Sequence, residues 1–383
     1  MLFLALGAVV LSFGLVAGNG DAFERTRSFS DIASSSARLQ ARNLAAEAQV
    51  LAAASQGGRA DEFRAQAEGL RTQAALLTVP GREPASGSAR NGSVEDLAGT
   101  REASGAGGPG ENAAAADRDE EAGRRHTERY VRALWESAQT NLHSAWRADG
   151  GTARLLAATG AAQQIWAVRI ADLSGVALPG PVPAGPGPAP DAAEEVPDSA
   201  DSPDAAGSSR PRNTGSCPAG RTPDPAPASA PAAAAAPAGP DAAAALTSVI
   251  NAELGTAYAY QVALAQADPG RETAADWRTQ VAGHEARGSD AVSFLADLCL
   301  PQVAPVAAYR LDPEFLGDPA GSLPDLEEQF PGVYADLVAL SDGDLRGWAI
   351  TRLAAISTDL YRHADTVPAA PGLDAVPDKL PWT

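Results

Sequence analysis

Residues 246–264 read LTSVINAELGTAYAYQVAL, and this stretch decides the fold class. Apolar residues, together with one glutamate, recur in it at alternating spacings of four and three: Leu246, Ile250, Glu253, Ala257, Tyr260 and Leu264. That spacing places them on one face of an α-helix. The stretch therefore predicts an amphipathic helix that carries a glutamate, Glu253, on its apolar stripe.

Three further stripes follow in the same unit. The second contains Trp277, Val281, His284, Gly288, Ala291, Leu295 and Leu298, the third Leu326, Phe330, Val333, Leu337 and Leu340, and the fourth Ala349, Leu353, Ile356, Leu360 and His363. Four helices with one stripe each bury those stripes most simply as a four-helix bundle, predicted here over residues 241–367. Pro331 and Gly332 predict a kink or break in the third helix just after Glu327, with Glu328 as the alternative inward-facing carboxylate.

Composition divides the rest of the chain. Residues 28–175 have helical spacing, interrupted at 80–118 by a Gly, Ser, Pro and acidic stretch that predicts a disordered loop. Residues 179–240 hold 16 of the 30 prolines, which predicts a disordered, extended linker. Residues 368–383 predict a tail. Because no strand pattern is present, we expect an all-α protein with two four-helix bundles, 28–175 and 241–367, joined by the linker.

The amino terminus begins with an unbroken run of apolar and small residues, Leu2 to Ala17. The run is shorter than the roughly 20 residues that cross a bilayer as a helix, and its length suits the apolar region of a signal peptide. Residues 1–20 therefore predict a signal peptide or a membrane anchor. The protein is expected to be extracytoplasmic, either secreted or held to the membrane by this segment.

Charge and cysteine content restrict the partners and the chemistry. A net charge of −19 argues against a nucleic-acid partner, since phosphate binding needs a basic surface. A protein partner or a homo-oligomer stays open. The two cysteines are Cys217, in the predicted linker, and Cys299, at the end of the second helix. In an oxidising compartment they are candidates for one disulfide, and the alternative is a buried free Cys299 with Cys217 unpaired.

The two helical regions resemble each other. Residues 61–70 align with 275–284 at a separation of 214, with an aromatic residue, Arg, Gln and Gly in register. Residues 161–172 align with 354–365 at a separation of 193. These matches predict that the chain contains two diverged copies of one bundle.

The carboxy-terminal unit also resembles a ferritin-like family of high-GC Gram-positive bacteria that is catalogued as a domain of unknown function. The likeness covers about residues 241–366. The residues that carry it are Ala252-Glu253, Ala257 to Tyr260, His284, Arg287, Asp290, Leu326-Glu327, Tyr334 to Val338 and Ala354-Ala355. The resemblance implies a ferritin-like four-helix bundle and implies no assigned activity.

Each helix of this unit carries one polar residue that could serve as a ligand: Glu253, His284, Glu327 and His363. A di-iron bundle also needs a glutamate three residues before each histidine, but Val281 and Leu360 occupy those positions. The four residues could hold a single divalent metal such as iron, manganese or zinc. The favoured alternative is a buried hydrogen-bond network between glutamate and histidine, completed by tyrosines.

The first bundle serves as an internal comparison. At the separations above, or within one residue of them, Leu39, Leu70, Trp135 and Ile170 stand in place of the four polar residues, so the first bundle is interpreted as structural. No nucleophile elbow or phosphate-binding loop is present. The sequence therefore favours a non-catalytic extracytoplasmic ferritin-like module with a binding or structural role. The second hypothesis is a metal-binding or ferroxidase-like protein that uses the carboxy-terminal bundle.

Overall fold

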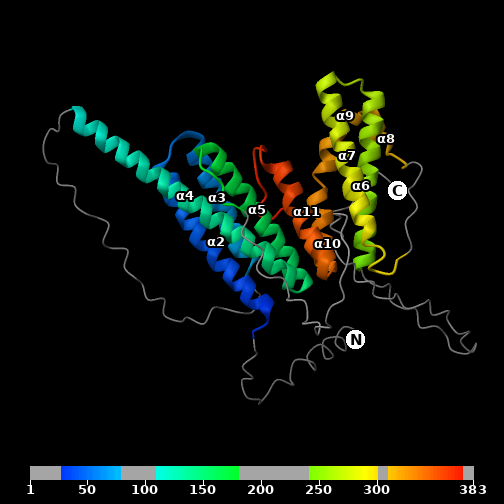
Figure 1. The fold of residues 1–383 in the computed structure, drawn as a ribbon, viewed down its shortest axis with the longest axis horizontal. Helices are drawn as coiled ribbons and strands as arrows, with labels where there is room; N and C mark the ends of the chain where they lie inside the picture. The colour runs from blue at the N-terminus through cyan, green and yellow to red at the C-terminus, as the bar shows by residue number, and fades with distance from the viewer. Residues whose placement is uncertain (1–26, 79–108, 181–240, 301–308, 374–383) are drawn as a thin grey trace, which may run out of the picture.

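A computed structural model of the chain describes residues 27–78, 109–180, 241–300 and 309–373 (Figure 1). Within these ranges the regular structure is helical and contains no strand, so the predicted all-α class is confirmed. The helices fall into two groups, about 29–174 and 242–361, in agreement with the predicted two-bundle layout.

The first group has four long helices: α2 (Phe29–Ala54), α3 (Gly57–Leu76), α4 (Pro109–Arg147) and α5 (Gly150–Ser174). Side chains fix two of the starts. Ser28 and Asp31 form a reciprocal capping box at the start of α2, and Asp149 accepts a hydrogen bond from the backbone N–H of Thr152 at the start of α5. In the core of this group, Phe63 and Tyr130 meet edge to face.

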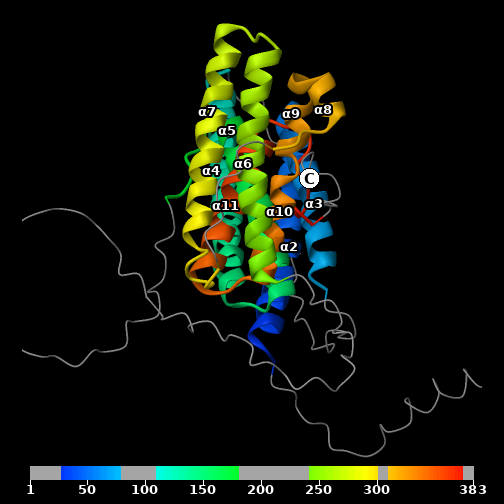
Figure 2. The ribbon, with the colours of Figure 1, turned by 90° about the vertical axis from the view of Figure 1, so that its right-hand side faces the viewer.

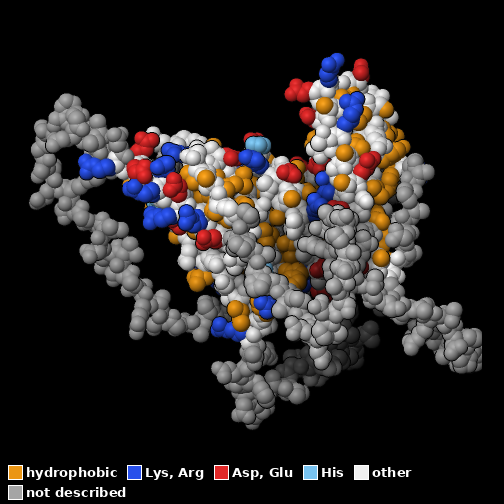
Figure 3. Space-filling view, viewed as in Figure 1, with side chains coloured by type: hydrophobic (Ala, Val, Ile, Leu, Met, Phe, Trp, Pro, Cys, Tyr) orange, Lys and Arg blue, Asp and Glu red, His pale blue; other side chains and the backbone are white. Residues whose placement is uncertain are grey.

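The long helix α4 begins earlier than its sequence suggests. A loop was predicted over residues 80–118, but the chain is helical from Pro109 onward, and that part of the prediction is wrong. Acidic and basic side chains are mixed along the projecting part of the helix (Figure 3), where Arg124 and Arg125 both pair with Glu121. Pairs at these spacings stabilise a helix that has no neighbour.

The second group contains α6 (Ala242–Gln266), α7 (Arg271–Ser293), α8 (Pro313–Gly317), α9 (Pro319–Glu327), α10 (Phe330–Leu340) and α11 (Gly343–Tyr361). α6 pairs with α7, and α10 packs against both α6 and α11 (Figures 1 and 2). The predicted break in the third helix is confirmed, since α9 ends at Glu327 and α10 begins at Phe330. Pro331 lies in the first turn of α10, where its missing N–H leaves no helical hydrogen bond unmade.

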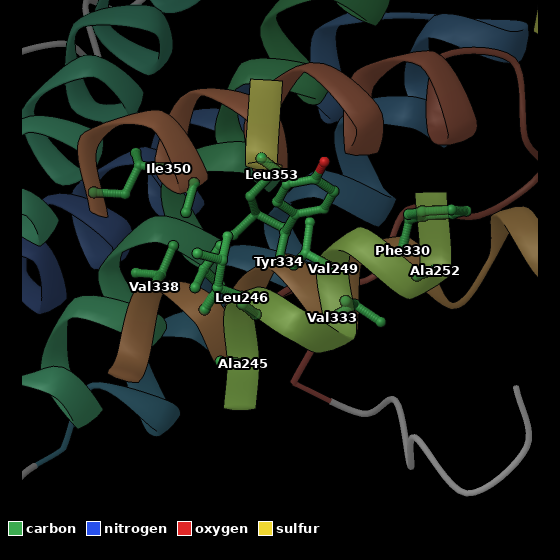
Figure 4. Close-up of a cluster of buried hydrophobic side chains, with 14 of the residues drawn as sticks. Ala245, Leu246, Val249, Ala252, Phe330, Val333, Tyr334, Val338, Ile350 and Leu353 are labelled. Atoms are coloured by element: carbon green, nitrogen blue, oxygen red, sulfur yellow. The ribbon is translucent and has the colours of Figure 1, made fainter. Parts of the chain in front are cut away.

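One hydrophobic core extends through both groups. In Figure 4, Leu246 and Val249 of α6 meet Val333 and Tyr334 of α10 and Leu353 of α11. The same cluster continues into residues of α4 and α5: Ala145, Ala148, Ala153, Leu156 and Ala157. α5 is apolar on nearly all sides because it packs against α4 on one side and against α10 and α11 on the other.

The packed part of the chain extends past the predicted bundle end. Residues 368–383 were predicted to be a tail, yet Ala370, Pro371 and Gly372 are buried. The side-chain amide of Gln73, on α3, donates to the carbonyl of Ala369 at 2.7 Å. The segment up to residue 373 is therefore a packed part of the fold.

Several predictions concern residues outside the described ranges. These are the signal peptide or anchor at 1–20, most of the loop at 80–118, nearly all of the linker at 179–240, residues 374–383 and Cys217. None of the described helices combines the length and the apolar character that crossing a membrane requires.

Candidate functional site

A histidine lies between two glutamates in the core of the second group. Glu253 of α6 and His284 of α7 are both fully buried, and Oε2 of Glu253 lies 2.7 Å from Nδ1 of His284. On the other side of the ring, Nε2 lies 3.0 Å from Oε1 of Glu327, the last residue of α9. The structure thus brings together three of the four predicted site residues, Glu253, His284 and Glu327. Glu328, the predicted alternative to Glu327, is exposed.

Close packing of α6 and α7 makes the contact between Glu253 and His284 geometrically feasible. Gly288, one turn beyond His284, is buried against α6, and a Cβ there would lie 2.7 Å from Cδ2 of Leu254. A larger residue at this position would force the Leu254 side chain to move. The glycine is therefore compatible with the close contact between α6 and α7 beside the two buried side chains.

Three further side chains complete the network. Arg287, one turn after His284, donates from Nε to both oxygens of Glu253 at 3.1 and 3.0 Å. The hydroxyl of Tyr334 donates to Oε1 of Glu253 at 2.6 Å, and that of Tyr260 donates to Oε1 of Glu327 at 2.8 Å. Two carboxylates therefore face two cationic side chains and two phenols, which satisfies the rule that buried charges are paired and hydrogen-bonded.

The surroundings of His284 favour its protonated form. Both ring nitrogens lie within hydrogen-bond distance of carboxylate oxygens, which only accept hydrogen bonds. Burial by itself would lower the pKa of His284, but the hydrogen bonds and charges of Glu253 and Glu327 outweigh it and raise the pKa. Nη2 of Arg287, which can only donate, also lies 2.8 Å from Nδ1, so the role of Nδ1 as donor or acceptor depends on the tautomer of the ring.

Glu327 and the two phenols also have shifted pKa values. Burial opposes ionisation of Glu327, yet its hydrogen bond to His284 and the nearby positive charge lower its pKa. Burial is also the largest cause that raises the pKa of the Tyr260 and Tyr334 phenols, and the neighbouring glutamates raise it further. Both phenols therefore remain protonated donors at physiological pH.

His363 lies outside this network, so its predicted place on the inward face of the fourth helix is wrong. Helix α11 ends at Tyr361, and His363 is exposed. The reason is that Arg169 of α5 binds the carbonyls of Tyr361 and Ala364, at 3.3 and 2.5 Å, and draws the chain toward the first group.

The remaining donors do not fit a metal ion. The two ring nitrogens of an imidazole point in different directions, so Glu253 and Glu327 lie on different sides of His284 and the three do not converge on one point. A metal-bound histidine must also offer a free lone pair, whereas both ring nitrogens here lie within hydrogen-bond distance of carboxylate oxygens. Arg287 places a fixed positive charge on Glu253. Among the described residues, no group of three or more His, Cys, Asp or Glu side chains has an arrangement suited to a metal.

The first group contains a related network of amides that the sequence did not reveal. The burial pattern of α2 recurs in α6 at a separation of 212 residues. At this separation the buried Ala41 is the residue equivalent to Glu253. Leu39, predicted for that place, is 60% exposed, so this alignment was wrong by two residues. At separations of 214 and 193, Gln73 corresponds to Arg287 and Asn141 to Tyr334.

These amides form a neutral chain. Asn141 donates to Gln163 at 3.1 Å, and Gln163 donates to Gln73 at 2.8 Å. Leu70, which stands in place of His284, is fully buried. Gln73 and Asn141, which correspond to Arg287 and Tyr334, are therefore linked through Gln163 by hydrogen bonds between uncharged amides.

The first group also contains a buried ion pair that was not predicted from the sequence. Glu62 of α3 is 7% exposed and accepts from Arg169 at 2.7 Å, while Gln66 donates to Glu62 at 2.9 Å and accepts from Tyr130 at 2.8 Å. A signal was present, because Glu62, Gln66 and Gln73 share one helical face with Phe63 and Leu70. In an alanine-rich helix, however, polar residues on one face are equally typical of a solvent-exposed face.

The class defined by these features is an all-helical protein whose second group encloses a charged, hydrogen-bonded centre. Residues 245–375 match a family model described as "Domain of unknown function (DUF4439)". This match supports a family of unknown function for the C-terminal part of the chain, as the sequence predicted in general terms. No curated protein and no solved structure matches the chain.

The network predicts how stability depends on pH. The raised pKa of His284 means that its contribution is fully present below the unfolded-state pKa, about 6.5, and is lost as the pH rises through the folded pKa. The lowered pKa of Glu327 means that its contribution is present above about pH 4.3 and is lost as the pH falls through its folded pKa. We expect the network to stabilise the fold most between these two limits.

Urea unfolding of the wild type and of His284→Gln across pH 4–9 measures this dependence. The difference in unfolding free energy should shrink as the pH rises above the neutral range. The exposed His363→Gln serves as a matched control and should show no such trend. A difference for His284→Gln that grows with rising pH would contradict a raised pKa of His284.

Proposed function

We propose that this protein is a non-catalytic, extracytoplasmic module with ferritin-like bundles and a binding or structural role. The observation that carries the proposal is the closure of the buried centre. Both oxygens of Glu253 and both nitrogens of His284 already have side-chain partners within the protein. A reactive site keeps a group or a coordination position open for substrate, whereas Glu253 and His284 are fully buried and fully engaged.

The surface hollows support the same interpretation. One hollow follows the exposed side of α4, and another lies between α3, α5 and the C-terminal segment, where Glu62 and Arg169 line it. Neither is lined by a residue of the network, so substrate has no route to His284 through them.

An extracytoplasmic location is supported by two features. The apolar run from Leu2 to Ala17 has the length of a signal-peptide core. Cys299 is disulfide-bonded, and structural disulfides persist mainly in oxidising compartments. Cys217 is the other cysteine of the sequence and lies outside the described residues, so its predicted pairing with Cys299 stays a prediction.

Metal analysis tests the proposal against the metal-binding or ferroxidase-like alternative. Protein purified without chelators, and then incubated with Fe²⁺, Mn²⁺ or Zn²⁺ and desalted, should retain less than one metal ion per chain. His284→Ala and His363→Ala should retain the same amount as the wild type. One retained ion per chain that His284→Ala abolishes and His363→Ala preserves would establish the alternative.

A further inference from the structure

The contact between the two groups of helices follows the internal repeat. Asp149 and Asp342 are N-caps of α5 and α11, and 193 residues separate them. This is the same separation that aligns residues 161–172 with 354–365. α5 and α11 are therefore equivalent helices of the two copies, and they pack directly against each other.

Pairs of contacting residues show that α5 and α11 run in the same direction. Gln164 of α5 donates to Thr358 of α11 at 3.4 Å, and nearer the helix ends Arg362 donates to Asp172 at 3.0 Å. Residue numbers thus increase together along both helices (Figure 1). Each contact joins positions that lie close to 193 residues apart, which is the pattern of two copies related by a two-fold axis parallel to the helices.

Near the start of α5 and α11, a contact between the two copies has a counterpart in which the copies exchange roles. Nε1 of Trp146 donates to the carbonyl of Gly343 at 3.0 Å. Subtracting 193 from Gly343 gives Gly150, and adding 193 to Trp146 gives Ala339. Gly150 does lie against the backbone of Ala339, so closely that a Cβ on Gly150 would be 2.1 Å from the carbonyl oxygen. In an isologous interface, a contact between residue i of one copy and residue j of the other is matched by a contact between j of the first copy and i of the second. The two contacts above form such a matched pair.

We propose that the face formed by α10 and α11 is a self-association surface, and that the first half of the chain occupies it as a covalently linked second copy. The interface is an internal dimer contact between equivalent helices. The partner that fits this face is therefore another copy of the same bundle. This inference is independent of the proposed function, because it rests on the contact between the halves and not on the buried centre.

Cutting the chain between the two halves tests the proposal. A recognition site for a specific protease is inserted between Asp191 and Ala192, so that Cys217 and Cys299 stay on the same fragment whether or not they are paired. After cleavage of the folded protein, the two fragments should elute together in gel filtration as one 1:1 species. Separation of the wild-type fragments would overturn the proposal.

Adjacent glycines supply a matched pair of variants. Gly150→Leu places a side chain against the Ala339 carbonyl and should abolish co-elution, while Gly151→Leu, at an exposed position, should preserve it. The released C-terminal fragment should keep its helical circular dichroism and elute as a homodimer, because its α10–α11 face is self-complementary. A helical monomer, or a fragment that loses its helical signal and aggregates, would contradict self-association.

A second pair of variants tests the interface by charge rather than by size. Arg362→Glu places like charges opposite Asp172, so the fragments of the cut chain should separate at a lower urea concentration than those of the wild type. Arg310→Glu, at an exposed position outside the contact, is the control and should behave as the wild type does. Equal behaviour of the two variants would remove the pair Arg362–Asp172 from the interface and count against the two-fold arrangement.

Discussion

Replacing Glu253 by glutamine is expected to lower the unfolding free energy by ~3–5 kcal/mol, the usual cost of removing one partner from a buried ion pair. The substitution preserves shape but leaves the two cations His284 and Arg287 with Glu327 as the remaining carboxylate of the network. Glu285→Gln is the control. Glu285 is exposed on α7, the helix that carries His284 and Arg287, and its substitution should change the free energy by less than about 0.5 kcal/mol.

A double variant separates loss of charge balance from loss of packing. Glu253→Gln combined with Arg287→Gln removes one negative and one positive charge, so His284 and Glu327 remain as a balanced pair. We expect the double variant to be more stable than the sum of the two single losses predicts, by about 1 kcal/mol or more. Additive losses in urea unfolding would show that Glu253 and Arg287 do not act on each other.

Replacing Arg346 by methionine is expected to destabilise the protein by about 3 kcal/mol. This arginine is buried, and it donates to the carbonyl of Val338 at 3.1 Å and to that of Ala148, in the other half of the chain, at 2.7 Å. Methionine fills a similar volume but leaves both carbonyls without this donor, and each bond to a charged group contributes roughly 1.5–3 kcal/mol.

The measurement is chemical unfolding followed by circular dichroism and by tryptophan fluorescence. Because Arg346 bonds across the interface, both signals should move together to lower denaturant in one transition. Arg352→Met is the control on the same helix, since Arg352 pairs with Asp290, which is half exposed, and should cost less than about 1 kcal/mol. Two separate transitions, of which Arg346→Met shifts one, would show that the halves unfold independently.

The sequence predicted helix positions and most of the buried centre, because these depend on local periodicity. The stripe through Leu246 and Ile250 placed Glu253 inward, and the break at Pro331 was expected from its ring. His284 and Glu327 followed from the same stripes and their flanks. The prediction for His363 was wrong because Arg169, a residue 194 positions before it, contacts the end of α11. No local sequence pattern indicates such a contact.

The contact between the two halves was missed for a related reason. Two separate bundles were expected because each amphipathic helix was assigned one buried face. Residues 155–168 contain no charged side chain, which is the pattern of a helix buried on all sides. That signal, in α5, was present in the sequence, but the partner that covers the second face cannot be read from α5 alone.

The joining of two equivalent bundles in one polypeptide changes how their association depends on concentration. Two separate chains would meet at a rate and an equilibrium set by their abundance, whereas a tether gives each half an effective concentration near the millimolar range. Dilution of the protein therefore should not release the contact between α5 and α11. The two halves therefore stay together although their buried polar groups differ, with the neutral amides of Gln73, Asn141 and Gln163 in one and the pair of Glu253 and His284 in the other.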